Sequence, residues 1–176
     1  IADDKTDYYF ETVAYGNGRW VVSGSYPGVI TSTDGKNWFQ TLIPDVESIW
    51  AVDYGDGKWV AIDDFGTVYS SPSGANWSKT GELPGEPFID HVKYAQGKWV
   101  AVGDNAIYSS TNLVDWTKRL DVPPEVVVEG SAPSNFQFWS IEYGNGRWFA
   151  TGGVSPGGPG DLIATSTDGS NWNSSP

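Results

Sequence analysis

The sequence predicts an all-β protein built from four similar units, and two observations lead to this fold class. First, a hexapeptide that begins with Tyr, has Gly at its fourth position and ends with Trp recurs about every 40 residues, at 15–20, 54–59, 94–99 and 143–148. Second, the 176 residues include 22 Gly, 11 Pro and 10 Trp. Turn-forming residues and large aromatic side chains in such numbers suit short strands better than long helices.

Each hexapeptide is expected to be a hairpin turn between the first two of four short strands. Asn17-Gly18 and Asn145-Gly146 favour the type I′ turn that joins antiparallel strands. The first strands are expected at 10–15, 49–54, 89–94 and 138–143, and the second at 20–23, 59–62, 99–102 and 148–151. The third strands are expected around 29–30, 68–69, 107–108 and 163–164, and the fourth end at Leu42, at Thr80, near Leu120 and at Pro176.

Four strands in a repeat of about 40 residues are typical of a β-propeller blade. We therefore predict a four-bladed β-propeller of four-stranded antiparallel blades, or alternatively part of a larger propeller. The whole chain, 1–176, is expected to be a single domain. Its repeats cover approximately 8–44, 45–84, 85–121 and 136–176, with an insertion at 122–135.

A second repeated turn, Ser-x-Asp-Gly-x-x-Trp, precedes each fourth strand. Asp34 and Asp168 are expected to accept backbone N–H bonds within it, whereas Ser73 and Asn112 replace this Asp in the two middle repeats. The Trp that ends each turn is expected to pack the turn onto its blade, as Trp38, Trp77, Trp116 and Trp172. The turn is similar to a shortened Asp-box, and the repeat resembles the Asp-box (BNR-like) repeats of bacterial secreted propellers, with sialidases as distant relatives.

Composition excludes several classes of partner. With 10 Lys and Arg against 22 Asp and Glu, the formal charge is −12, which argues against nucleic acid and against an anionic membrane surface. The chain has no Cys, and no apolar run is long enough for a membrane span. We expect no cofactor. Acidic turn residues such as Asp63 and Asp104 could supply oxygen ligands to calcium, but no calcium-binding motif supports this, so the metal content is left open.

Variation between the repeats is concentrated on one face of the expected propeller. Both repeated turns lie on the other face, which we interpret as scaffold. The variable face carries the insertion at 122–135 and a long turn at 152–161, and because both border blade four they should be neighbours. Variable loops on a rigid scaffold are a usual place for binding. They could equally be surface loops without a partner.

One position at the start of each innermost strand is the predicted ligand site on that face. It holds Glu11, Trp50, Asp90 and Trp139, and His91 follows Asp90. In a closed four-bladed ring the two carboxylates would face each other across the two Trp side chains. Such a site suits a sugar, through CH–π stacking and hydroxyl acceptors, or a cationic group. In the alternative interpretation the Trp side chains pack between blades, the acids are solvated and His91 is structural.

The primary functional hypothesis is a non-catalytic, extracellular or periplasmic propeller that binds a carbohydrate or a protein around blade four. The first residue, Ile1, suggests a processed or excised piece and so favours export. Sialidase chemistry is not expected, because that family's arginine cluster has no counterpart among Arg19, Arg119 and Arg147. No catalytic residue is assigned. One alternative is a glycosidase-like hydrolase that uses Glu11 and Asp90. The other is an assembly protein, a homo-oligomer that exchanges its N-terminal segment to complete the last blade.

Overall fold

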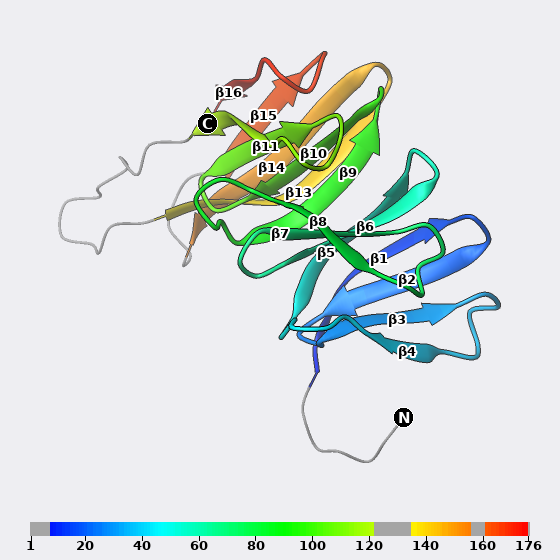
Figure 1. Cartoon of the computed structure of the whole chain (residues 1–176). Helices are drawn as coiled ribbons and strands as arrows, with labels where there is room; N and C mark the ends of the chain where they lie inside the picture. The colour runs from blue at the N-terminus through cyan, green and yellow to red at the C-terminus, as the bar shows by residue number, and fades with distance from the viewer. Residues whose placement is uncertain (1–7, 122–134, 156–160, 176) are drawn as a thin grey trace.

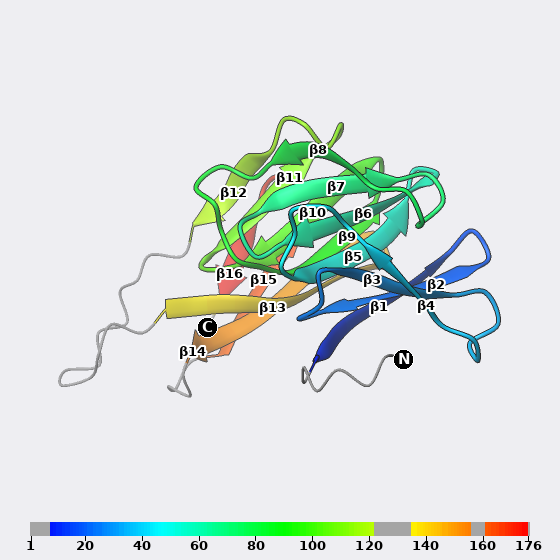
Figure 2. The same ribbon diagram turned by 60° about the horizontal axis from the view of Figure 1, so that its bottom comes forward.

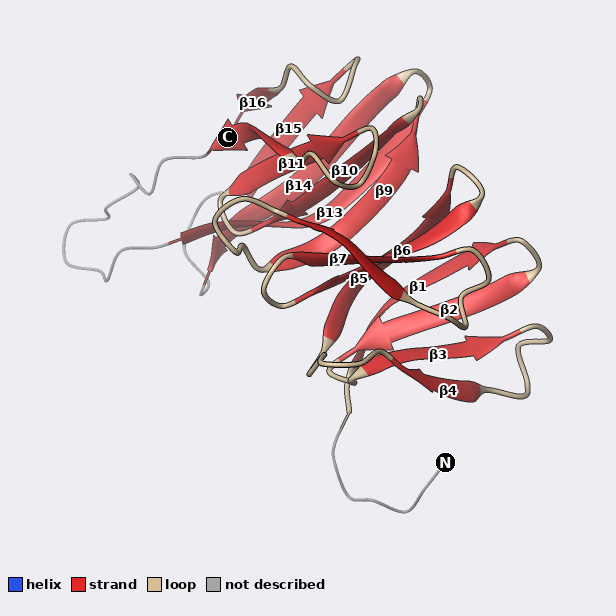
Figure 3. Cartoon of the chain, viewed as in Figure 1, coloured by secondary structure: helices blue, strands red, loops and turns tan. Residues whose placement is uncertain are grey.

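In the computed structural model, which describes residues 8–121, 135–155 and 161–175, the chain consists of strands and turns without a helix in these ranges (Figure 3). Repeat 1 contains β1 (Phe10–Gly16), β2 (Arg19–Gly24), β3 (Gly28–Ser32) and β4 (Phe39–Leu42). Repeat 2 contains β5 (Ile49–Gly55), β6 (Lys58–Asp63), β7 (Thr67–Ser71) and β8 (Ser78–Glu82). Repeat 3 contains β9 (Ile89–Ala95), β10 (Lys98–Gly103), β11 (Ala106–Ser110) and β12 (Thr117–Asp121). Repeat 4 contains β13 (Asn135–Gly144), β14 (Arg147–Ser155), β15 (Asp161–Ser166) and β16 (Asn173–Ser175).

Within each repeat, consecutive strands pair antiparallel in chain order, and so the predicted all-β class is confirmed. The strands of repeats 3 and 4 form two separate four-stranded sheets. Those of repeats 1 and 2 count as one eight-stranded sheet, because Gly24 of β2 pairs with Ile49 of β5. The predicted strand ends are met to within a residue or two, except in repeat 4. No helix of the described chain could cross a membrane.

Repeat 4 differs from the sequence prediction because its first two strands are longer than those of the other repeats. The turn expected at 152–161 begins as strand: β14 continues to Ser155, and β13 starts at Asn135 and pairs with it. The antiparallel ladder simply continues beyond the positions that the repeat comparison could align. Residues 122–134 and 156–160 of the two expected insertions lie outside the described residues. The described residues that flank them, Asn135 and Ser155, pair with each other.

Three apolar clusters lie between consecutive repeats and hold them together. We call the side of a repeat that packs on the preceding repeat its leading face, and the side that packs on the following repeat its trailing face. The buried leading faces are formed by Ile49, Val52 and Trp59 in repeat 2, by Ile89, Val92 and Trp99 in repeat 3, and by Phe138, Ile141 and Trp148 in repeat 4. The buried trailing faces are formed by Val21 and Val29 in repeat 1, by Val60 and Val68 in repeat 2, and by Val100 and Ile107 in repeat 3.

The two ends of this row of repeats carry exposed apolar side chains. The leading face of repeat 1 is formed by Phe10, Val13 and Trp20, and Val13 is 58% exposed. The trailing face of repeat 4 is formed by Phe149, 45% exposed, and Ile163. The first two views agree that β15 and β16 lie at the other end of the molecule from β3 and β4 (Figures 1 and 2). A return of repeat 4 onto repeat 1, as in a closed four-bladed ring, is therefore not seen among the described residues.

The strand that completes repeat 4 comes from its own chain. β16 pairs with β15 through Asn173, Ser174 and Ser175. The N-terminal residues 1–7, expected to pair there or to exchange between subunits, lie outside the described residues. The segment that follows them stays with repeat 1, because the Tyr9 N–H donates to Ser25 Oγ at 2.7 Å and the Ser25 N–H donates to the Tyr9 carbonyl at 2.9 Å.

Candidate functional site

One residue near the start of every inner strand is left out of the strand ladder. In β1, Phe10 pairs with Gly24 and Thr12 with Ser23, so that Glu11 is the extra residue of a β-bulge. The same register shift occurs in the other three repeats, where the extra residues are Trp50, Asp90 and Trp139. A bulge bends its strand and turns the extra side chain in a new direction. The sequence comparison identified this repeated position, but not the bulge that sets its geometry.

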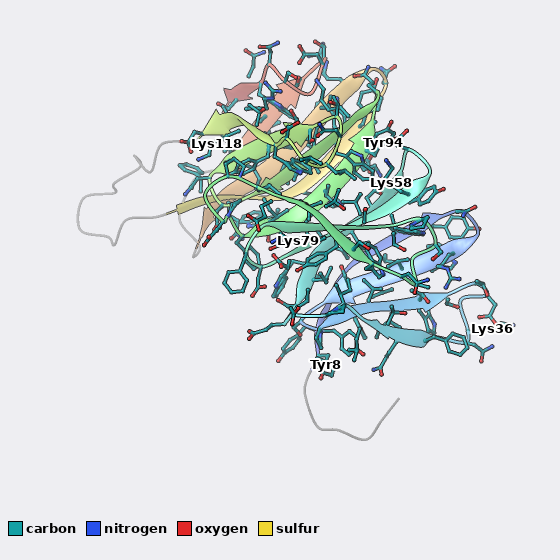
Figure 4. The ribbon with its side chains drawn as sticks, in the orientation of Figure 1. Tyr8, Lys36, Lys58, Lys79, Tyr94 and Lys118 are labelled. Carbon is teal, nitrogen blue, oxygen red and sulfur yellow. The ribbon has the colours of Figure 1, made fainter. Side chains whose placement is uncertain are left out.

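These four side chains converge on one cavity of about 320 Å³, although they come from four different repeats. Glu11, Trp50, Asp90 and Trp139 line it together with Thr12 and His91. The structure thus brings together all five residues of the predicted ligand site. The lysines labelled in Figure 4 do not line this cavity. The described lining therefore combines two indoles and two carboxylates with the side chains of Thr12 and His91.

Asp90 is the carboxylate most firmly held at the cavity. The side-chain Nε2 of Gln137 donates to both of its carboxylate oxygens, at 2.9 and 3.2 Å. Burial raises the pKa of Asp90 to about 6, and the negative charges of Asp104 and Glu11 act in the same direction. Gln137 belongs to the extended part of β13, which also forms a bridge with Asp104 of repeat 3. The extension of repeat 4 thus positions a carboxylate of repeat 3, a role that no repeat comparison could reveal.

The two tryptophans present different surfaces to the cavity. Trp50 is partly buried: its Nε1 donates to Ser48 Oγ at 3.0 Å, and its ring packs on Phe88 with centroids 5.0 Å apart. Trp139 lines the cavity and is 50% exposed, so that part of this side chain is accessible to a ligand. The packing of Trp50 agrees with the alternative interpretation, in which the tryptophans serve the scaffold. The exposure of Trp139 does not.

His91 is used in the contact between repeats 3 and 4. Its Nδ1 accepts the Ile141 N–H at 3.2 Å, which places the ring proton on Nε2. Burial lowers the pKa of His91, and the nearby Lys93 lowers it further, so the imidazole is neutral at pH 7. A neutral ring that accepts a backbone N–H agrees with the structural interpretation of His91, while its position leaves it beside any ligand in the cavity.

The Asp-box-like turns lie at the opposite ends of the strands from the bulges. Asp34 Oδ1 accepts the N–H groups of Lys36 and Asn37 at 2.8 Å, and Asp168 makes the equivalent two bonds in repeat 4. In repeat 3, Asn112 Oδ1 accepts two backbone N–H groups in the same way. Among the turn tryptophans, Trp77, Trp116 and Trp172 pack into the clusters between repeats, whereas Trp38 of repeat 1 is exposed.

The acidic residues considered for calcium are engaged elsewhere or dispersed. Asp63 Oδ1 accepts the N–H groups of Phe65 and Thr67 at 2.9 and 2.8 Å, and the Tyr69 hydroxyl donates to its Oδ2 at 3.2 Å. Asp63 therefore closes the turn between β6 and β7. Within the described ranges, no three His, Cys, Asp or Glu side chains are grouped as a metal site.

Comparison with solved structures shows which fold this chain shares. YCF48 bound to the D1 peptide is 20% identical, with a TM-score of 0.62 over 98% of this chain and 55% of that chain. YCF48 from Cyanidioschyzon merolae is 17% identical, with a TM-score of 0.53 over 97% and 73%. The extracellular domain of a putative hybrid two-component system from B. thetaiotaomicron is 11% identical, with a TM-score of 0.62 over 98% and 23%. These likenesses show a β-propeller-like fold.

The particular family is not identified by sequence. No protein-family model matches the chain, and no curated protein matches it. The chain spans little more than half the length of the YCF48 chain that is bound to the D1 peptide. The likeness to solved structures therefore concerns the arrangement of strands alone.

Proposed function

We propose that this chain is a non-catalytic binding propeller that recognises a carbohydrate or a segment of another protein at the cavity lined by Glu11, Trp50, Asp90 and Trp139. The observation that carries the proposal is that the same bulge, repeated in four repeats, directs these four side chains into one space. Bulges are over-represented next to active sites, where they re-aim a side chain, which supports a ligand site at this position.

The chemistry of the lining suits both ligand classes. The exposed indole of Trp139 can stack on the CH groups of a sugar or on a cationic side chain, and the carboxylates of Asp90 and Glu11 can accept hydrogen bonds from either. One structural neighbour was solved with a peptide bound, which supports a protein segment as ligand. Another is an extracellular domain, which supports an extracellular or periplasmic location.

The test is a glycan array and a peptide array probed with the wild-type chain and two matched variants. Trp139→Ala should weaken binding of any hit at least about tenfold, the effect of losing one stacked cation or ring face. Trp38→Ala removes an exposed indole on the scaffold face and should leave binding unchanged. No hit on either array, or a hit that both variants bind as well as the wild type, would refute the proposal.

A second candidate function is glycoside hydrolysis, and one observation favours it. Asp90 has a pKa raised to about 6 beside a second carboxylate, Glu11, and a retained proton is what a general acid requires. Hydrolysis of aryl glycosides should then be abolished by Asp90→Asn and by Glu11→Gln. Hydrolysis that persists in both variants would exclude this mechanism.

A further inference from the structure

The exposed faces at the two ends of the molecule repeat the chemistry of the buried contacts between repeats. In each internal contact, the middle residue of a leading face lies in one apolar cluster with the two trailing-face residues of the preceding repeat. These sets are Val52 with Val21 and Val29, Val92 with Val60 and Val68, and Ile141 with Val100 and Ile107. Repeat 1 has Val13 at this leading position, and repeat 4 has Phe149 and Ile163 at the trailing positions. Both ends therefore carry one half of the same contact, and both halves are exposed.

A tyrosine–glycine contact shows the match in more detail. A Cβ atom added at Gly16 would overlap the ring of Tyr54 in the next repeat, and one added at Gly55 would overlap the ring of Tyr94. At the equivalent Gly144 of repeat 4, no described atom beyond its chain neighbours lies within 4 Å of such a Cβ. The equivalent tyrosine of repeat 1, Tyr15, is exposed.

We propose that the leading face of repeat 1 binds the trailing face of repeat 4 in a second copy of this chain. Because each copy carries both faces, two copies can form the contact twice and close a ring around a common axis. In each contact Val13 of one copy lies against Phe149 of the other, and Tyr15 lies on Gly144. This inference is independent of the proposed ligand. It also differs from exchange of the N-terminal segment, because sheet faces pack and no strand changes place.

The net charge of the chain predicts how this dimer responds to salt concentration. Each chain carries a formal charge of −12, so two copies repel each other at long range. The faces themselves are apolar and are unaffected by screening. Raising the salt concentration should therefore strengthen the dimer, whereas a dimer held by salt bridges would weaken.

The experiment measures the mass of the intact chain by light scattering and sedimentation as a function of concentration. The wild type should be a dimer, and Val13→Lys or Phe149→Glu should each raise the dimer dissociation constant at least about 30-fold, as expected for a residue central to an interface. Gly144→Leu should do the same, because its side chain would occupy the space of the partner copy's Tyr15. Phe65→Glu replaces a Phe in the β6–β7 turn that is 58% exposed, more than Phe149, and should leave the dimer intact.

Mixing the two charged variants distinguishes this arrangement from other assemblies. The Val13→Lys variant keeps a wild-type trailing face, and the Phe149→Glu variant keeps a wild-type leading face. In an equimolar mixture these two intact faces form one wild-type contact. The two altered faces meet in the other contact, where the new Lys and the new Glu form a pair. A heterodimer should form where neither variant dimerises alone. A wild-type monomer at all concentrations would overturn the proposal, as would a dimer that resists both variants or is lost on deletion of residues 1–7.

Discussion

The first hairpin and the third hairpin have nearly the same sequence pattern and the same fold, yet their tryptophans have different surroundings. Trp99 is buried in the cluster between repeats 2 and 3, whereas Trp20 is 39% exposed. Each ring contacts the tyrosine of its own hairpin, with centroids 4.8 Å apart in repeat 3 and 4.6 Å in repeat 1. The hairpin is therefore determined locally, and the burial of its Trp depends on a preceding repeat. Stability in such an array lies largely in contacts between neighbours.

The largest difference is expected when these two tryptophans are removed. Trp99→Ala leaves a cavity between two repeats and should lower the free energy of unfolding by about 3–5 kcal/mol. Trp20→Ala loses mainly its contact with Tyr15 and should cost about 1 kcal/mol. Urea unfolding of both variants at a concentration where the chain is monomeric measures the difference. Equal losses would show that Trp20 is buried by a contact absent from this structure.

The same comparison can be made at the glycines that precede the hairpin turns. Gly55→Val would drive a side chain into the ring of Tyr94 and should destabilise the fold by about 1–3 kcal/mol. Valine is the sharper choice because Ala95 fills this position in repeat 3 and shows that a single methyl group is accommodated. Gly144→Val meets no described atom of its own chain and, at a concentration where the chain is monomeric, should change stability by no more than about 0.5 kcal/mol. Thermal unfolding of the two variants side by side would reveal any hidden neighbour of Gly144.

A smaller difference is expected between the two bulged carboxylates, Asp90 and Glu11, in how the free energy of unfolding depends on pH. The pKa of Asp90 is raised to about 6 in the fold and is about 3.9 in an unfolded chain. Its stabilising contribution is therefore complete below about pH 4 and is lost as the pH rises through 6. Asp90→Asn should flatten this dependence and stabilise the fold at pH 7 by up to about 1 kcal/mol, after allowance for solvent screening. Urea titrations between pH 4 and 7 measure this dependence, with Glu11→Gln at the exposed bulge of repeat 1 as the matched control. A change in the free energy of unfolding by Glu11→Gln as large as that by Asp90→Asn would contradict the role of burial.

The smallest effect is expected at the Asp-box-like turns, where repeat 1 and repeat 4 should behave alike. Hydrogen bonds from the N–H groups of residues 37 and 36 hold the pKa of Asp34 below its usual range, and those of residues 171 and 170 do so for Asp168. Stability from these carboxylates is present above the unfolded pKa of about 3.9 and declines as the pH falls. Asp34→Asn and Asp168→Asn should weaken the acid sensitivity of the urea midpoint equally, since Asn112 makes the same bonds without a charge. Unequal effects would mean that these turns sense their neighbours.

The sequence predicted whatever depends on local chemistry. Hairpin turns such as Asn17-Gly18 and the Asp34 turn have local signatures, and their regular spacing predicted strand order and the shared position of Glu11, Trp50, Asp90 and Trp139. Contacts set by distant partners were not predictable. The bond from Gln137 to Asp90 joins residues 47 positions apart and requires the extension of β13. Repetition also suggested a ring, but the exposed Val13 and Phe149 show that the count of repeats does not fix closure.

The four bulges also bear on how such a protein could be redesigned. A bulged residue has no partner in the strand ladder, and none of the four belongs to the apolar clusters that join the repeats. Carboxylate and indole already alternate at this position without altering the register of the strands that follow. The side chains at the cavity can therefore be exchanged without disturbing the strand register, provided that Trp50 is changed together with its partners Ser48 and Phe88 and Asp90 together with Gln137.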